Sequence, residues 1–148
     1  MNIKDLHPSK KSRYIQGYIN PKSCKKLIDQ SQPIIYRSSY EKKFMVWLEG
    51  SRNVARWGSE CVRIPYLFAD GKMHSYYPDY YVEMTDGSKL LIEIKPLNQT
   101  KAPTNENAWA AREWTRNTCK WKAAQEFCAA KNMQFKILTE NTINKLIL

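Results

Sequence analysis

Residues 76–96 read YYPDYYVEMTDGSKLLIEIKP, and this stretch decides the fold. Tyr76 to Met84 is rich in aromatic and β-branched residues, Leu90 to Lys95 is largely aliphatic, and Asp86-Gly87 lies between the two runs. Two such runs around a turn dipeptide predict a β-hairpin. The chain is therefore expected to contain a sheet with these two strands as antiparallel neighbours.

The second strand of this hairpin carries an acid and a base on one face. Side chains alternate between the faces of a strand, so Leu90, Ile92 and Ile94 form a core face while Glu93 and Lys95 lie on the other. An acid and a base placed side by side on a strand indicate a catalytic site. An ordinary hairpin with a surface Glu/Lys pair is the alternative, and the strand pattern alone leaves it open.

The length of the turn decides whether Asp79, on the first strand, meets Glu93. A two-residue Asp86-Gly87 loop would leave the two acids on opposite faces. A three-residue loop from Thr85, with Gly87 left-handed, sets Asp79 directly opposite Glu93, with Cβ atoms roughly 4.5–5.5 Å apart. Two carboxylates that close repel each other unless a cation lies between them. We therefore predict the three-residue turn and a hard divalent cation, Mg²⁺ or Mn²⁺.

These residues suit phosphodiester hydrolysis, which needs a metal, an activated water and relief of the charge that develops in the transition state. Asp79 and Glu93 are predicted to hold the metal, and the carbonyl of Ile94 is a further candidate ligand. Lys95 is predicted to orient or deprotonate the water and to stabilise the developing negative charge.

Glu41 is a third candidate acid. It precedes Phe44, Met45 and Leu48 at helical spacing, so it lies on the apolar face of a helix that starts at a serine cap and ends near Gly50. A carboxylate directed towards a core needs a partner, and a metal site would supply one. The competing explanation is an S-x-x-E capping box from Ser38 to Glu41. Both readings stay open.

The rest of the chain predicts further helices and strands. Overall the order α-β-β-β-α-β-α implies an α/β fold, with a mixed sheet and a helix on each side. The predicted elements are a short helix around Ser23 to Ser31 opened by Pro21, a strand from Val62 to Phe68 interrupted by Pro65 at an edge or bulge, a helix from about Asn107 to Lys131 stopped at Asn132, a strand from Gln134 to Leu138 and a helix from Glu140 to Leu148.

Length and charge limit the function further. A chain of 148 residues has room for one domain, predicted over residues 21–148 after a flexible basic arm over residues 1–20. No apolar run is long enough to cross a bilayer and no secretory signal begins the chain, so we expect no membrane partner. The net charge of +10 favours nucleic acid. Lys10, Lys11, Arg13 and Lys101 are predicted phosphate contacts.

The strings that contain these acids resemble a known family. Glu41, the Pro78-Asp79 pair and Glu93-Ile94-Lys95 are similar to the PD-(D/E)XK nuclease signature. The wider strings resemble its TnsA-like branch and, within that branch, the head completion nucleases of tailed phages. The likeness covers nearly the whole chain from Tyr36. Its strings are YRSSYE at 36–41, IPY at 64–66, HSYYPDY at 74–80, LIEIKP at 91–96, KWKAA at 120–124 and FKILTE at 135–140.

The resemblance implies a restriction-endonuclease-like core and Mg²⁺-dependent cleavage of double-stranded DNA in the completion of phage heads. Endonuclease action is expected, and additional exonuclease action is left open. It implies Glu41, Asp79 and Glu93 as metal-side acids and Lys95 as the catalytic lysine. Lys120 and Lys122 point differently along their helix, so at most one is expected to reach the site.

Several wider expectations follow from the same resemblance. Head or neck proteins are possible partners, a monomer and a homodimer are both open, and the host cytoplasm or the virion is the expected location. Two alternatives remain: a structural head or neck protein that binds DNA without cutting it, and a transposase-type or junction-resolving endonuclease.

Overall fold

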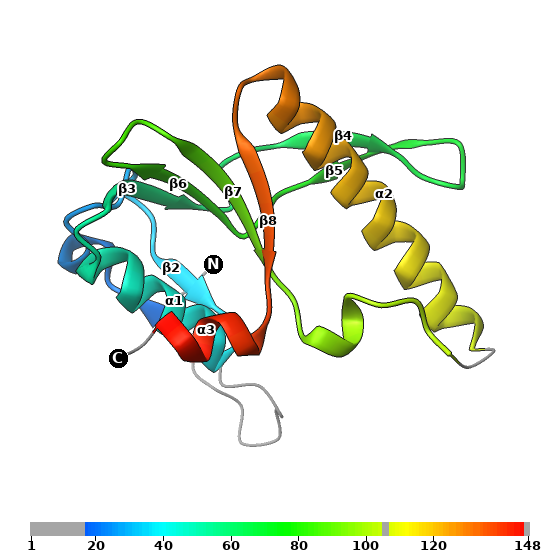
Figure 1. The fold of residues 1–148 in the computed structure, drawn as a ribbon, viewed down its shortest axis with the longest axis horizontal. Helices are drawn as coiled ribbons and strands as arrows, with labels where there is room; N and C mark the ends of the chain where they lie inside the picture. Colours follow the sequence, from blue (N-terminus) through cyan, green and yellow to red (C-terminus); the bar gives the residue numbers. More distant parts are fainter. Residues whose placement is uncertain (1–16, 105–106, 147–148) are drawn as a thin grey trace.

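The computed structural model describes residues 17–104 and 107–146. Its centre is a four-stranded sheet in the order β3-β6-β7-β8 (Figure 1). The strands are β3 (Val54–Ser59), β6 (Tyr80–Met84), β7 (Lys89–Ile94) and β8 (Gln134–Leu138). Strands β7 and β8 are parallel and the other pairs are antiparallel. The sheet is mixed, as the sequence predicts.

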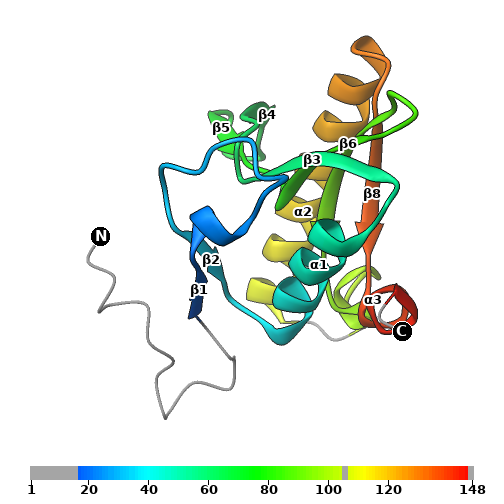
Figure 2. The same ribbon diagram turned by 90° about the vertical axis from the view of Figure 1, so that its left-hand side faces the viewer.

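Helices cover both faces of this sheet. Helices α1 (Ser39–Gly50) and α3 (Glu140–Leu146) lie on one face and α2 (Ala108–Ala130) on the other (Figures 1 and 2). Ile92 of β7 packs in a core with Phe44 of α1, whereas its neighbour Leu91 packs in a second core with Ala124 of α2. Both faces of β7 are thus buried, and the predicted α/β fold with a flanked mixed sheet is confirmed.

The hairpin has the turn that the sequence analysis favours. Met84 N donates to Ser88 O at 2.8 Å and Gly87 N to Met84 O at 3.0 Å, so Met84 pairs with Ser88 across three turn residues. Gly87 has a φ of +90°, which a glycine adopts without steric cost. The strand register, with Tyr80 opposite Ile92, places Asp79 opposite Glu93. The predicted three-residue turn is confirmed.

Capping residues set the ends of the helices as expected. The Ser38 hydroxyl accepts from Glu41 N at 3.1 Å and begins α1. Asn107 caps the start of α2 through Trp109 N. Asn132, with a φ of +55°, follows the end of α2. No helix in the described part of the chain is long and apolar enough to cross a membrane.

The strand predictions before the hairpin were partly wrong. The predicted strand 62–68 is β4 (Ile64–Leu67), but β4 pairs with β5 (Met73–Tyr76) in a separate two-stranded sheet. The first strand of the main sheet is instead β3. The predicted strand 76–84 is also divided, since β5 ends at Tyr76 and β6 begins at Tyr80. Pro78 lies in the break, where it has no N–H to donate to a ladder.

The N-terminal predictions need a second correction. Only Pro21–Ser23 is helical, as the single 3-10 turn η2, and the predicted helix from Ser23 to Ser31 is absent. The segment follows β3 instead, with Ile28 N donating to Trp57 O at 2.9 Å. Strand β1 (Gly17–Ile19), inside the arm predicted over 1–20, pairs with β2 (Ile34–Tyr36). Residues 1–16 lie outside the described residues.

Candidate active site

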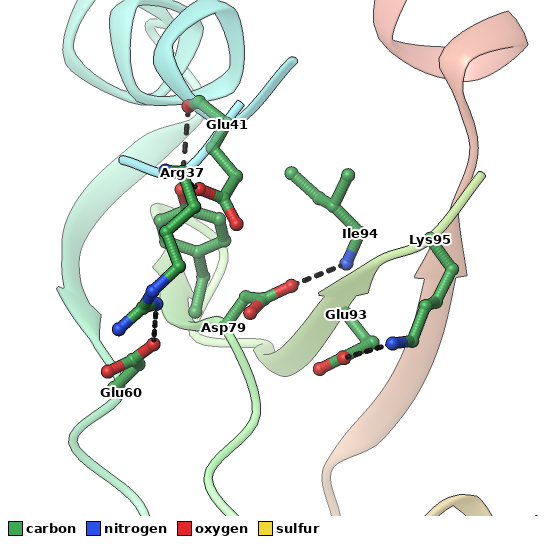
Figure 3. Close-up of polar contacts among 8 residues, drawn as sticks. Arg37, Glu41, Glu60, Asp79, Glu93, Ile94 and Lys95 are labelled. Carbon is green, nitrogen blue, oxygen red and sulfur yellow. Dashed lines mark hydrogen bonds and ion pairs between the residues drawn. The ribbon is translucent and has the colours of Figure 1, made fainter. Parts of the chain in front are cut away.

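Asp79 and Glu93 meet at one end of the hairpin. Asp79 directly precedes β6, and Glu93 is the next-to-last residue of β7. The Asp79 carboxylate accepts a hydrogen bond from Ile94 N at 2.8 Å. Figure 3 shows Asp79 and Glu93 side by side at this end of the sheet, with Lys95 next to Glu93. Their side chains are therefore on the same side of the sheet, which is the geometry that the three-residue turn requires.

Burial raises the pKa of both carboxylic acids. Burial, and then the negative charge of Glu93, raise the pKa of Asp79 to about 8. Burial also raises the pKa of Glu93, whose residue is only 8% exposed. The Tyr76 hydroxyl donates to Glu93 Oε2 at 2.7 Å and offsets part of this effect. At neutral pH Asp79 therefore retains a proton in the metal-free protein, and a bound cation would favour its release.

Two lysines supply positive charge beside Glu93. Lys95 Nζ lies 4.0 Å from Glu93 Oε1. Lys120 approaches from α2, where its Nζ lies 5.6 Å from the centre of the Tyr76 ring and its charge lowers the pKa of Glu93. Burial lowers the pKa of Lys120 itself. Lys122 is exposed, so of the two helix lysines it is Lys120 that the fold brings to Glu93.

Glu41 joins the site from the first turn of α1. Its carboxylate accepts a hydrogen bond from Arg37 N, one residue before the Ser38 cap. The predicted capping box is therefore present, except that the Glu41 carboxylate binds the N–H of Arg37 instead of that of Ser38. Glu41 is also close to the acidic pair, since its negative charge helps to raise the pKa of Asp79 (Figure 3). The two readings of Glu41 left open by the sequence are compatible in the structure.

Arg37 and Glu60 border the site, although neither was predicted as a site residue; Arg37 belongs to the string YRSSYE, and Glu60 lies outside all the quoted strings. Arg37 Nη1 lies 2.7 Å from Glu60 Oε1, and Glu60 N donates to Asp79 O at 3.0 Å (Figure 3). Glu60 has a φ of +50°, an uncommon backbone for a residue other than glycine. It follows β3, which the sequence pattern did not reveal. Tyr76 was also missed as a site residue, because its contact with Glu93 depends on the break before β6.

The residues predicted to contact nucleic acid do not all lie near the acidic pair. Lys101 is exposed on the connection between β7 and α2, beyond Lys95. Lys10, Lys11 and Arg13 lie outside the described residues. The structure therefore brings Asp79, Glu93, Lys95, Lys120 and Glu41 to one place, while Lys101 and Lys122 lie on open surface.

The donor set fits a hard cation, although only in part. Across residues 17–104 and 107–146, no three His, Cys, Asp or Glu side chains come together closely enough to hold a metal ion. Two carboxylates do meet, and a third, Glu41, is within electrostatic reach. The main-chain carbonyl of Ile94 could add an oxygen, because the N–H and C=O of one strand residue point to the same edge and Ile94 N faces Asp79. Carboxylate and carbonyl oxygens are the ligands that Mg²⁺ and Mn²⁺ prefer.

This fold and this end of its sheet define a nuclease domain of the PD-(D/E)XK class, and the comparisons with known proteins agree. Residues 51–140 match the family model described as TnsA-like endonuclease N terminal, and the chain belongs to this family. It is also 36% identical over 137 residues to the Head completion nuclease of Enterobacteria phage T4. That match covers 85% of this chain and 91% of the relative. The resemblance to the TnsA-like branch is confirmed.

Proposed function

We propose that the chain is a metal-dependent deoxyribonuclease that cuts double-stranded DNA, with Asp79, Glu93 and Lys95 at the centre of its active site. The observation that carries this proposal is the meeting of the Asp79 and Glu93 carboxylates beside an ammonium group. A buried acidic pair with raised pKa values is costly for a structural protein and useful around a cation.

Asp79, Glu93 and the carbonyl of Ile94 would hold Mg²⁺ or Mn²⁺, with Glu41 adding negative charge from α1. The cation would polarise the phosphoryl oxygen and acidify a bound water. The protein prepares this place in two ways. Ile94 N fixes one Asp79 oxygen, and the Tyr76 hydroxyl fixes one Glu93 oxygen, so both side chains are oriented before a ligand arrives.

Lys95 and Lys120 would act on the phosphate and the water. Lys95 is partly exposed, with a quarter of its side chain accessible (25%), so its ammonium group can reach a phosphate oxygen or a water next to Glu93. Lys120 is more enclosed and is held over Tyr76. Both ammonium groups would stabilise the negative charge that develops as the phosphodiester is attacked.

The biological setting is also a proposal. The T4 relative is named for head completion, and the match extends over nearly all of both chains. We therefore assign this chain to the same stage, in the cytoplasm of an infected host, acting on the DNA of newly filled heads and contacting head or neck proteins.

Plasmid nicking tests the activity. Wild type and Asp79→Asn are incubated with supercoiled plasmid in Mg²⁺, in Mn²⁺ and in EDTA, over a range of salt. Wild type should convert the plasmid to nicked and linear forms in either metal and should leave it intact in EDTA. Asp79→Asn should lose at least about a hundredfold in rate, as expected when an essential group is removed from a metal-dependent site.

Glu126→Gln provides the matched control. Glu126 is an exposed acid on α2, and its replacement should leave nicking at the wild-type rate. Equal rates for Asp79→Asn and wild type, or intact plasmid with wild type in every metal, would overturn the proposal. The second outcome combined with tight DNA binding would support the non-catalytic head protein instead. Preference for branched over linear DNA would support the junction-resolving alternative.

A further inference from the structure

A groove leads away from the proposed active site along the connection between β7 and α2. In Figure 1 this connection, which contains the 3-10 turn η3 (Leu97–Gln99), runs from the end of β7 to the start of α2. Lys95 is one of the residues that line the groove. Its other walls include Gln99, Lys101, Trp109, Trp114 and Asn117. A molecule bound in the groove would therefore touch the same lysine that faces Glu93.

Asn117 is the polar residue that points to a ligand. It is only 9% exposed, on the inner side of α2. Its side-chain amide makes no hydrogen bond to any other described residue. Every described side-chain N or O atom that is sealed from solvent does have a hydrogen-bond partner, so the Asn117 amide cannot be sealed. The amide must therefore open to the groove that it lines. Its donor and acceptor groups are therefore available to a ligand that enters the groove.

Aromatic side chains border this amide. Trp109 is 70% exposed, which is unusual for an indole that has no bound partner. Trp114 packs edge-on against Trp121, with ring centroids 5.9 Å apart, and this contact fixes its position. Indole faces stack on nucleobases, while an amide pairs with the donor and acceptor groups of a base edge. The two features together suit a base that has left its partner strand.

The groove carries charge of both signs. The Glu113 carboxylate, which also lines it, lies 3.8 Å from Arg116 Nε. Its positive groups, Lys95 and Lys101, can bind a phosphate. A single nucleotide could thus place its phosphate on a lysine and its base between the tryptophans and Asn117.

We propose that this groove binds one unpaired nucleobase next to the phosphodiester that is cut. The inference rests on the proposed function for its purpose, and it adds a preference for DNA with an unpaired nucleotide at the cleavage point, such as a frayed end or a gap, over continuous duplex. Within a continuous duplex the Watson–Crick edges are paired and the faces are stacked, so Trp109 could not stack on a base and Asn117 could not pair with its Watson–Crick edge.

Binding without cleavage tests the subsite. The full-length protein is titrated in EDTA into two DNA hairpins that each carry one 2-aminopurine. In one hairpin this base is the first unpaired nucleotide of an overhang, and in the other it is paired within a blunt stem. Wild type should bind the overhang more tightly and quench its fluorescence. Trp109→Ala and Asn117→Leu should each weaken overhang binding by about tenfold, the effect of removing one stacking or base-edge interaction.

Three comparisons decide the outcome. Tyr18→Ala, which removes another exposed aromatic ring, should bind both hairpins as wild type does. Any one of three results would overturn the subsite. Wild type could bind the two hairpins with equal affinity, both groove variants could bind the overhang as wild type does, or the groove variants could lose the same affinity on both hairpins. Thermal melting checks that the variants fold. Because no metal or cutting is involved, failure of the nuclease proposal would appear in plasmid nicking and not in this titration.

Discussion

At the scale of the residue, Asp79 links metal binding to stability. Its pKa of about 8 in the folded protein lies above the ordinary value of 3.8. Between these values the folded protein holds a proton that the unfolded chain has released, so stability falls as the pH rises through this window. In EDTA, Asp79→Asn should be more stable than wild type at pH 8 by at least about 1 kcal/mol, or roughly 2–4 °C in Tm. Near pH 4 the difference should vanish.

Thermal unfolding at both pH values measures this effect, with Glu126→Gln as the control that should match wild type throughout. Adding Mn²⁺ at pH 8 should raise the Tm of wild type and leave Asp79→Asn nearly unchanged, because ligands that bind only the folded state stabilise it. If wild type were more stable than Asp79→Asn at pH 8 in EDTA, the pKa of Asp79 would not be raised in the folded protein.

Lys95 permits a second prediction at the same scale. Lys95→Ala should reduce the rate of plasmid nicking by about 10²–10⁴, the range for removal of one acid–base or charge-stabilising group. DNA affinity in EDTA should change little, because one phosphate contact is a small part of a salt-dependent interface. Lys89→Ala, at the exposed far end of the same strand, is the matched control. Equal reductions in the two variants would mean that the effect is general charge and not position.

At the scale of the element, the turn of the hairpin holds the site together. Deleting Ser88 would leave the three-residue turn in place but pair Met84 with Lys89, so the register would shift by one residue and Asp79 would lie opposite Ile94. Nicking should then be lost even if the fold survives. Gly87→Ala should keep the register and the activity, at a cost of about 1 kcal/mol, because the added Cβ meets no atom within 4 Å and only the positive φ opposes it. Tm and nicking rate measured together separate the two effects, and an active deletion variant would contradict this role of the turn.

Local signals explain which elements the sequence reveals. The hairpin, α1 and α2 follow from turn and capping residues that act within a few positions of the chain, and all three are confirmed. Strand β3 escaped notice because its buried residues do not alternate, and a bulge lies between Val54 and Arg56. The helix predicted after Pro21 is absent because Leu27 and Ile28 pair with Trp57, a contact between residues far apart in the sequence.

The same contrast applies to the candidate site. Asp79, Glu93 and Lys95 share one hairpin, so side-chain alternation and turn length suffice to place them together. Glu60 and Arg37 reach the site only because β2, α1 and β3 pack around it, and no spacing in the sequence announces that arrangement. Asn117 is one of many polar residues on a long helix, and only its burial beside a groove distinguishes it.

At the scale of the whole molecule, the net charge of +10 is not spread evenly over the chain. Residues 1–16 carry Lys4, Lys10, Lys11 and Arg13 against Asp5, ahead of the first described strand. The proposed active site is built entirely from residues after them. Binding and cutting should therefore be separable by removing this segment.

A chain that starts at Gly17 should keep the nicking rate at saturating DNA while binding duplex DNA more weakly. Each phosphate that the shortened protein no longer neutralises should reduce the slope of log affinity against log salt by about 0.9, so the slope should fall by up to roughly 3.6 units if all four basic residues bind phosphates. Fluorescence anisotropy in EDTA across a series of salt concentrations measures the slope. Replacing Lys10, Lys11 and Arg13 together by Gln in the full chain should produce most of the same change, because charge and not chain length is responsible. An unchanged slope in both proteins would mean that the described domain alone supplies the contacts to DNA.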